Sequence, residues 1–407
     1  MSFDHLFTPI KVGNVTFKNR IGLAPMGVCL NPDSNEIDER TIAYFEARAK
    51  GGIGYITSSP ACIDEDLCGI ADVGQYYLTR KEHVEGIKKI CNAVHKYDTK
   101  IAIQLLHPGR QGASYMSHGQ QPVAPSALKE ADFDWLEMPR ELSVDEIKSL
   151  VQKYIQGAIY AYEGGADGVE LHGAHGYLIH QFMSPRSNKR KDMYGGSFEN
   201  RMRFITEIIH GIKAIQPENT FLSVRINAID FLEDGIQIEE GKKIALYLQD
   251  LGIDAISISG GTYSCQDALI EPQIQEEGWR SDAYLKECKG LLHIPVFAAN
   301  HIKRPATAET MLKEGICDVV LLGRQSMADP NWSKKAQEGK ADQIRYCISC
   351  NYCTDQVSSG KPVKCSVNPY LSKEADYNEK TIVKNGNGRK VVVIGGGPAG
   401  MEAALIA

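Results

Sequence analysis

The chain has 407 residues, which predicts two or three domains, although an α/β barrel of about 250 residues counts as one. Lys plus Arg number 45 and Asp plus Glu 51, so the net charge of −6 excludes an electrostatic case for binding nucleic acid or an anionic membrane. Small molecules are the expected partners, and the oligomeric state, a homo-oligomer included, is left open.

The first residues, Met1 to His5, contain neither a basic region nor an apolar core, and no window of about 18 residues is apolar and uncharged. We therefore expect a soluble, unexported protein of the cytoplasm. The eleven cysteines are an odd number, and four of them lie between Cys347 and Cys365. In a chain without a secretory signal this pattern argues against disulfides and for reduced thiolates at a metal site.

Short β-branched runs alternate with segments of helical period along most of the chain. Eight runs predict strands, namely Ile21 to Ala24, Gly54 to Thr57, Ile101 to Leu105, Gly168 to Leu171, Phe221 to Ile226, Ala255 to Ser259, Pro295 to Ala298 and Val319 to Leu322. Helices are predicted at Glu39 to Lys50, Lys81 to Tyr97, Val144 to Glu163, Phe198 to Ile215 and Glu239 to Leu251, and Ser143 with Glu146 forms a capping box. Eight β-α units with near-continuous apolar strands predict an α/β fold, a closed parallel (β/α)8 TIM barrel, rather than an open doubly wound sheet.

The ends of the predicted strands carry polar side chains, glycines and two arginines. In chain order they are Pro25 and Met26, Ser58 and Ser59, Gln104 with His107, His172 with His175 and Tyr177, Arg225, Gly260 and Gly261, Ala299 and Asn300, and Gly323 and Arg324. Small residues let a flat ring approach the backbone, and glycine-containing loops after strands seven and eight are where barrels often hold a phosphate. This face predicts a phosphorylated planar cofactor. A buried ion pair is the structural alternative for Arg225.

The loop after the third strand, from His107 to about Leu142, is long and contains several glycines and prolines. Loops of that length are usually lids or binding loops, and a decorative excursion is the alternative.

The fourth strand end carries the chemistry. His172 and His175, three residues apart, can point at one small oxygen, and Tyr177 can stand within reach of the neighbouring carbon. Such a group could polarise a carbonyl and deliver a proton. The alternative is two structural histidines and a packing tyrosine.

The pattern changes beyond Leu322. Cys347, Cys350, Cys353 and Cys365 have the spacing C-x2-C-x2-C-x11-C, and Asn368-Pro369 follows. Three thiolates on one tight loop and a fourth brought back by a turn can cage an iron-sulfur cubane or a tetrahedral zinc ion, and the close packing favours iron-sulfur.

A polar stretch and a glycine turn close the sequence. The segment up to Gly388 predicts a linker, Lys390 to Ile394 a buried strand, and Gly395, Gly397 and Gly400 a G-x-G-x-x-G turn opening a helix at Met401. Only the first part of a Rossmann-like dinucleotide domain is present, which predicts a truncated sequence.

Three stretches resemble the old yellow enzyme family of flavin barrels. They are His172-Gly-Ala-His175-Gly-Tyr177-Leu-Ile-His-Gln-Phe, Ser184-Pro185-Arg-Ser-Asn188 and Tyr194-Gly195-Gly196-Ser-Phe-Glu199-Asn200-Arg201. The cysteines and the glycine turn narrow the resemblance to the multidomain iron-sulfur branch, which includes 2,4-dienoyl-CoA reductase, 2-enoate reductase, the bile-acid-inducible flavin reductases and trimethylamine dehydrogenase. The domains it implies are an FMN-binding barrel at 1–340, a 4Fe-4S segment at 341–370, a linker at 371–388 and the start of an FAD and NAD(P)H domain at 389–407.

The resemblance also implies roles for single residues. Pro25, Met26, Ser59 and Gln104 would lie against the isoalloxazine of FMN, Arg225 beside its N1 and O2 edge, and Ala299, Asn300, Gly323 and Arg324 near its phosphate. Cys347, Cys350, Cys353 and Cys365 would hold a 4Fe-4S cluster, and electrons would pass from NADH or NADPH through FAD and the cluster to FMN.

The implied reaction is reduction of the C=C bond of an α,β-unsaturated carboxylate, ketone or thioester. Hydride from FMN N5 would reach the β-carbon, His172 and His175 would donate to the carbonyl oxygen, and Tyr177 would protonate the α-carbon. Two alternatives stay open, an amine dehydrogenase of the trimethylamine dehydrogenase type and an inactive flavin-binding or electron-transfer remnant. Dienoyl-CoA reductase is the poorer match, because Gly260-Gly261-Thr262-Tyr263-Ser264 stands where that enzyme has its catalytic histidine.

Overall fold

The computed structural model describes residues 3–31, 34–129, 136–265, 272–299, 301–378 and 385–407. Its centre is a closed barrel of eight parallel strands, as predicted. The strands are β3 (Ile21–Leu23), β4 (Tyr55–Thr57), β6 (Lys100–Leu106), β9 (Gly168–Gly173), β10 (Phe221–Asn227), β11 (Ala255–Ser259), β12 (Val296–Ala298) and β13 (Val319–Leu322). They pair in the order β4-β3-β13-β12-β11-β10-β9-β6, and pairing of β4 with β6 closes the barrel.

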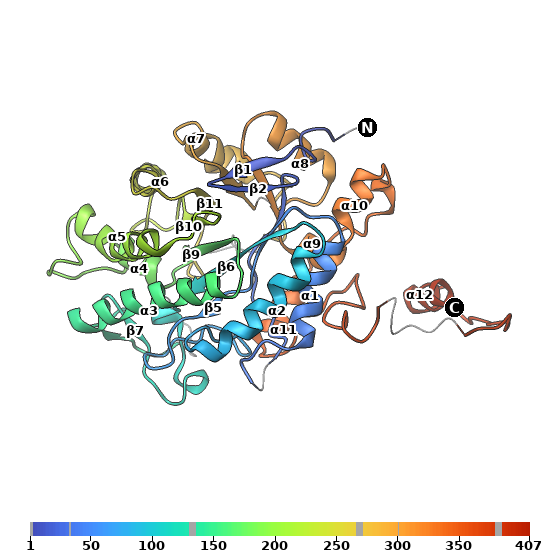
Figure 1. Cartoon of the computed structure of the whole chain (residues 1–407), viewed down its shortest axis with the longest axis horizontal. Coiled ribbons are helices and arrows are strands. Elements are labelled where there is room, and N and C mark those ends of the chain that lie inside the picture. The colour runs from blue at the N-terminus through green and yellow to red at the C-terminus, as the bar shows by residue number, and fades with distance from the viewer. Residues whose placement is uncertain (1–2, 32–33, 130–135, 266–271, 300, 379–384) are drawn as a thin grey trace.

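Helices surround the barrel (Figure 1). They are α1 (Glu39–Lys50), α2 (Val84–His95), α3 (Val144–Glu163), α4 (Leu178–Met183), α5 (Phe198–Ile215), α6 (Ile238–Asp250), α7 (Lys286–Lys289), α8 (Pro305–Lys313), α9 (Arg324–Ala328) and α10 (Trp332–Gln337). The predicted bounds of α1, α3 and α5 match at both ends. The capping box at α3 is confirmed, because the Ser143 side chain accepts from the Glu146 N–H while the Glu146 carboxylate accepts from the Ser143 N–H. Among the described residues no helix is long and apolar enough to cross a membrane.

Aromatic rings fill the interior at the amino-terminal end of the barrel. The hairpin of β1 (Ile10–Val12) and β2 (Val15–Phe17) brings in Phe17, whose ring stacks on Tyr55 with centroids 4.7 Å apart. The ring centroids of Phe221 and Phe297 lie 5.6 and 6.0 Å from the ring centroid of Phe17. All four residues are fully buried, so this end is closed by packing.

The long loop after β6 crosses the carboxyl-terminal end of the barrel. It contains a short pairing of β7 (Val123–Ala124) with β8 (Arg140–Glu141), and residues 130–135 lie outside the described ranges. A further strand, β5 (Ala61–Cys62), pairs with the carboxyl-terminal end of β6. The amide of Gln111, in this loop, donates to the His175 carbonyl at 2.8 Å, so the loop contacts the predicted catalytic stretch.

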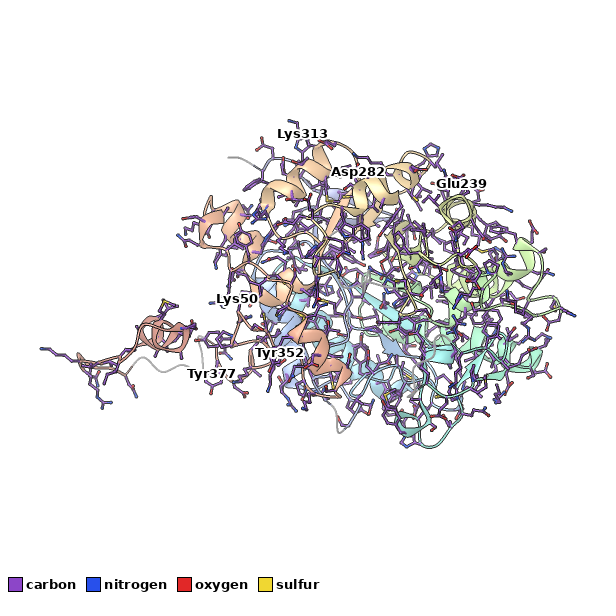
Figure 2. The ribbon with its side chains drawn as sticks, turned by 180° about the vertical axis from the view of Figure 1, so that it is seen from behind. Lys50, Glu239, Asp282, Lys313, Tyr352 and Tyr377 are labelled. Atoms are coloured by element: carbon purple, nitrogen blue, oxygen red, sulfur yellow. The ribbon has the colours of Figure 1, made fainter. Side chains whose placement is uncertain are left out.

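The segment after α10 returns to the barrel through α11 (Tyr352–Ser358). Leu371 is buried and the Glu374 carboxylate lies 2.8 Å from the Arg48 guanidinium, so the first part of the predicted linker is packed against α1. The domain boundaries themselves stay predictions. Seen from behind, Tyr352 lies on the body of the molecule, whereas residues 385–407 lie away from it (Figure 2).

The predicted strand at Lys390 to Ile394 is not formed. These residues adopt no regular structure, and Ile394 is 96% exposed. A buried parallel strand needs neighbours to pair its N–H and C=O groups, and the described part of the chain places none beside it. The helix α12 (Pro398–Ile406) does follow, starting three residues before the predicted Met401, and lies away from the barrel (Figure 1).

Candidate active site

A cavity of about 230 Å³ opens at the carboxyl-terminal ends of the barrel strands. Its walls include most of the residues predicted from the strand ends, namely Pro25, Met26, Gln104, His172, His175, Tyr177, Arg225, Ala299, Gly323 and Arg324. Ser59 is buried in an adjoining cavity of about 20 Å³ that shares Gly27, Pro60 and Asp72 with the larger one. Asn300 lies outside the described residues.

His172, His175 and Tyr177 form one aromatic group on the wall of this cavity. The His172 ring centroid lies 5.3 Å from that of His175 and 4.8 Å from that of Tyr177. The Ala174 N–H donates to His172 Nδ1 at 3.3 Å, so the ring proton of a neutral His172 is on Nε2. Tyr177 Oη lies 3.4 Å from Tyr263 Oη, which comes from the loop after β11. The predicted triad is therefore assembled at one place.

His175 is held from three sides in an uncommon conformation. Its φ of +60° lies in the left-handed region, which a residue other than glycine adopts only when its surroundings fix it. The His175 N–H donates to Asn227 Oδ1 at 3.3 Å and its carbonyl accepts from Gln111. Its Nε2 lies 2.8 Å from Ser259 Oγ on β11.

Both histidines are neutral at ordinary pH. Burial lowers the pKa of His172 and of His175 well below the usual value, and the positive charge of Arg225 lowers both further. Each ring therefore offers one N–H donor without carrying a charge. That is the form a hydrogen-bonding carbonyl recognition site needs.

Arg225 lies below these rings in a buried polar layer. Its Nη1 donates to Ser257 Oγ at 3.1 Å, and its Nη2 lies 3.4 Å from Ser259 Oγ. The Gln104 amide donates to the Glu170 carboxylate at 2.7 Å, and Gln104 Oε1 has no partner in the described ranges. Burial raises the pKa of Glu170 to about 7, although Arg225 opposes the shift.

The other end of the cavity is lined by the loops after β12 and β13. The Arg324 guanidinium donates to the Pro272 carbonyl at 2.6 Å and to Asn351 Oδ1. Gly323 precedes it, and a Cβ there would lie 3.5 Å from Met26 Sδ, so a side chain would narrow the cavity. A guanidinium beside glycine-rich backbone is a suitable environment for a phosphate.

Several cavity residues escaped prediction. Arg280 and Tyr263 line the wall, and Arg280 Nη1 donates to the Ala299 carbonyl at 2.8 Å. Tyr263 lies two residues beyond the predicted strand end at Gly260 and Gly261, and Arg280 belongs to the excursion before α7, where no strand end marks it. His301 also lines the cavity, and its Nε2 lies 2.7 Å from Ser349 Oγ, between two of the predicted cysteine ligands.

The predicted metal ligands are only partly gathered. Cys347 and Cys353 line the cavity, Cys350 is exposed, and Cys350 Sγ lies 3.2 Å from Ser366 Oγ. Burial raises the pKa of Cys365, with further contributions from Cys347 and Cys350. Within the described ranges no three His, Cys, Asp or Glu side chains are arranged to hold a metal ion. The 4Fe-4S ligand set therefore stays a prediction.

The three glycines of the terminal turn lie outside the cavity. Gly395 has a φ of +107°, and a Cβ on Gly400 would come 2.0 Å from the Gly395 carbonyl oxygen, so both positions require glycine.

A closed parallel barrel with a polar, cationic cavity at its strand ends is the architecture of barrel enzymes that bind a phosphorylated cofactor. The family model of the NADH:flavin oxidoreductase / NADH oxidase family matches residues 5–343. The chain belongs to this family.

Longer proteins are similar to the whole chain. The NADH oxidase of Thermoanaerobacter brockii is 42% identical over 410 residues, covering 100% of this chain and 62% of its own length. The N,N-dimethylglycine/sarcosine dehydrogenase of Chromohalobacter salexigens is 34% identical over 415 residues, covering 100% of this chain and 59% of its own. The chain thus spans about three fifths of these curated relatives.

Solved structures agree with the fold. A 2-naphthoyl-CoA reductase in complex with 2-naphthoyl-CoA has a TM-score of 0.88 and 30% identity, covering 92% of this chain and 58% of its own.

Proposed function

We propose that the chain is the FMN-holding part of an NAD(P)H-dependent ene-reductase that reduces the C=C bond of an α,β-unsaturated carboxylate, ketone or thioester. The observation that carries the proposal is the group of two neutral imidazoles and one phenol on a cavity wall beside Arg225. The substrate class follows from this group, because its donors suit a carbonyl oxygen and its phenol suits a carbon two bonds away.

The polar layer supports FMN as the resident cofactor. Gln104 Oε1 and Arg225 Nε are buried atoms that find no hydrogen-bond partner among the residues the structure describes, and one is an acceptor and the other a donor. The pyrimidine edge of an isoalloxazine offers the complementary pattern, an N–H donor at N3 and, next to it along the edge, the acceptors O2 and N1. Arg225 would stabilise negative charge at N1, since a guanidinium does not deprotonate. Ala299, Gly323 and Arg324 would hold the phosphate.

FMN, when bound, supplies the hydride that adds to the β-carbon of the alkene. His172 and His175 donate to the carbonyl oxygen as negative charge develops there, and one such donor is worth about 3 to 4 kcal/mol of barrier. Tyr177 gives its proton to the α-carbon, because a phenol is protonated at neutral pH and still acidic enough for an enolate.

The cysteine and glycine motifs extend the proposal. Cys347, Cys350, Cys353 and Cys365 would hold a 4Fe-4S cluster, which is supported by the two cysteines on the cavity wall. Gly395, Gly397 and Gly400 would form the phosphate turn of an FAD domain, which is supported by the close approach of Gly400 to Gly395.

Oxidation of an amine is the competing proposal, favoured by the dimethylglycine/sarcosine dehydrogenase relative. The charged residues of the cavity wall argue against amine oxidation. In the described part of the chain, the charged wall residues are Arg225, Arg280, Arg324 and Lys303 against Asp72. FMN would meet the charges of Arg225 and Arg324, and the remaining Arg280 and Lys303 against Asp72 leave no excess of negative charge to attract a cationic substrate.

The test uses the chain purified without oxygen, with its flavin released and identified and its iron and sulfide measured. Cinnamate is assayed with reduced methyl viologen as electron donor, and methylated amines are assayed with ferricenium as electron acceptor. We expect turnover of cinnamate, and a loss of about 10²- to 10⁴-fold in Tyr177→Phe at unchanged flavin content. Turnover of amines alone would overturn the proposal, and a flavin-loaded chain that reduces no alkene would favour the inactive remnant.

A further inference from the structure

A buried polar network lies behind the catalytic group, on the side away from the cavity. It consists of Asn227 at the end of β10, Asp230 in the loop that follows, and His180 on α4. His180 and Asp230 are 1% and 0% exposed, and His180 Nε2 lies 2.9 Å from Asp230 Oδ1. None of the three side chains lines the cavity.

The side chain of Asn227 joins three strand-end loops. Its Nδ2 donates to Asp230 Oδ1 at 2.8 Å and to the Gly261 carbonyl at 2.9 Å, while its Oδ1 accepts from the His175 N–H. Because a carboxylate only accepts, Asp230 fixes which end of the amide faces His175. The loops after β9, β10 and β11 are therefore held in register by one side chain.

Both carboxylate oxygens of Asp230 have hydrogen-bond partners. Its Oδ1 faces His180 and Asn227, and its Oδ2 accepts from the Ile236 N–H at 2.9 Å. His180 lies in the first turn of α4, and Tyr177 is the residue that caps this helix. The buried Asp230 carboxylate thus connects the backbone of His175, through Asn227, with the helix that follows Tyr177.

We propose that Asn227, Asp230 and His180 are positioning residues that hold His175 in its left-handed conformation and keep the imidazole donors and the Tyr177 phenol aimed at one substrate. The inference rests on the proposed function for the identity of that substrate. The backbone of His175 needs such support, because a left-handed φ is unfavourable for histidine, and the His175 N–H donates to Asn227 Oδ1 at the end of β10. Displacement of a catalytic group by about 1 Å can cost on the order of 10²-fold in rate.

The experiment compares matched variants of the FMN-loaded chain. Asp230→Asn removes the charge at nearly constant shape, His180→Leu removes the pair, and His180→Gln keeps a donor close to the position of Nε2. Asp167→Asn is the control, since Asp167 pairs with His95 at 2.7 Å and accepts from the Ile101 N–H, at the opposite end of β9.

Two measurements do not depend on alkene turnover. One is hydrogen exchange of the backbone amides in the peptide 172–183, and the other is binding of p-chlorophenol, whose phenolate oxygen would take the place of the carbonyl oxygen over oxidised flavin. We expect Asp230→Asn and His180→Leu to speed exchange and to weaken phenolate binding by about 10-fold or more. We expect cinnamate turnover to fall by about 10- to 100-fold, while His180→Gln and Asp167→Asn stay within about threefold of wild type.

The inference is overturned if Asp230→Asn and His180→Leu exchange and bind like wild type, or if Asp167→Asn changes both as strongly. If Asp230→Asn does not fold, the two His180 variants decide. A wild-type chain that reduces no alkene would refute the proposed function alone, because exchange and phenolate binding would still test the network.

Discussion

The two ends of the barrel are formed by the same eight strands, but one end is filled by packed side chains and the other holds an open cavity. At the amino-terminal end, Phe17, Tyr55, Phe221 and Phe297 fill the interior with fully buried rings. At the carboxyl-terminal end, a cavity is lined by arginines, imidazoles and phenols. Strand β9 shows the difference within a few residues, since it starts after Asp167 and ends at His172 and Gly173. The packed end supplies stability, which allows the other end to keep polar groups and a strained backbone.

The largest effect is expected from the packed end. Phe17→Ala removes a buried ring that contacts three others, so it should lower the free energy of unfolding by about 3 to 5 kcal/mol. Turnover per folded molecule should not change. Thermal melts and activity at a temperature where the variant is folded measure the two effects. Equal losses of stability and of turnover would remove the distinction between the ends.

His172→Ala should lower turnover and leave the free energy of unfolding nearly unchanged, the reverse of Phe17→Ala. It removes one donor to the carbonyl oxygen, so turnover of cinnamate should fall by about 10² to 10³, or about 3 to 4 kcal/mol of barrier. His95→Ala is the control at the opposite end, because His95 pairs with Asp167 far along β9. A variant of His172 that melts early and still turns over normally would make this histidine a structural residue.

The pH dependence sharpens the comparison further. The pKa values of His172 and His175 are lowered by burial, so below about pH 6.5 only the unfolded chain is protonated there, and stability is lost as pH falls, by up to about 1.4 kcal/mol per pH unit for each histidine. Glu170 acts in the opposite sense. Its pKa is raised to about 7, so stability is present below the unfolded value and is lost as pH rises toward 7.

Glu170→Gln separates the two contributions. Without the carboxyl, we expect the unfolding free energy to fall more steeply as the pH drops from 6.5 to 5 than in wild type, because the opposing contribution of Glu170 is gone and those of His172 and His175 remain. Urea unfolding at several pH values measures the slopes. Identical slopes in both chains would mean that Glu170 is ionised in the folded protein.

The barrel could be predicted because strand and helix periods are local properties of the sequence. The bounds of α1, α3 and α5 and the position of every barrel strand follow from apolar spacing and caps. The prediction of a strand at Lys390 to Ile394 was wrong, because strand formation depends on neighbouring strands and not only on composition.

The site was predictable where residues stand at strand ends. His172, His175, Tyr177 and Arg225 are found from that rule alone. Arg280 and Tyr263 come from an irregular excursion, and the network of Asn227, Asp230 and His180 depends on contacts between loops far apart in sequence. No local pattern announces such contacts, because they exist only after the barrel has closed.

The smallest expected effect tests whether every element at the cavity end belongs to the site. Ser143 caps α3, and neither Ser143 nor Glu146 lines the cavity. Ser143→Ala leaves an N–H at the helix start without its acceptor and should lower the free energy of unfolding by about 1 kcal/mol. Ser143→Thr, which keeps the hydroxyl, is the matched control. Cinnamate turnover and phenolate binding should equal wild type in both variants, because the cap stabilises the helix without contacting His175 or its supports. A change in phenolate binding with Ser143→Ala alone would mean that the stability of α3 affects the catalytic group. The separation of stabilising residues from functional residues would then not follow the two ends of the barrel.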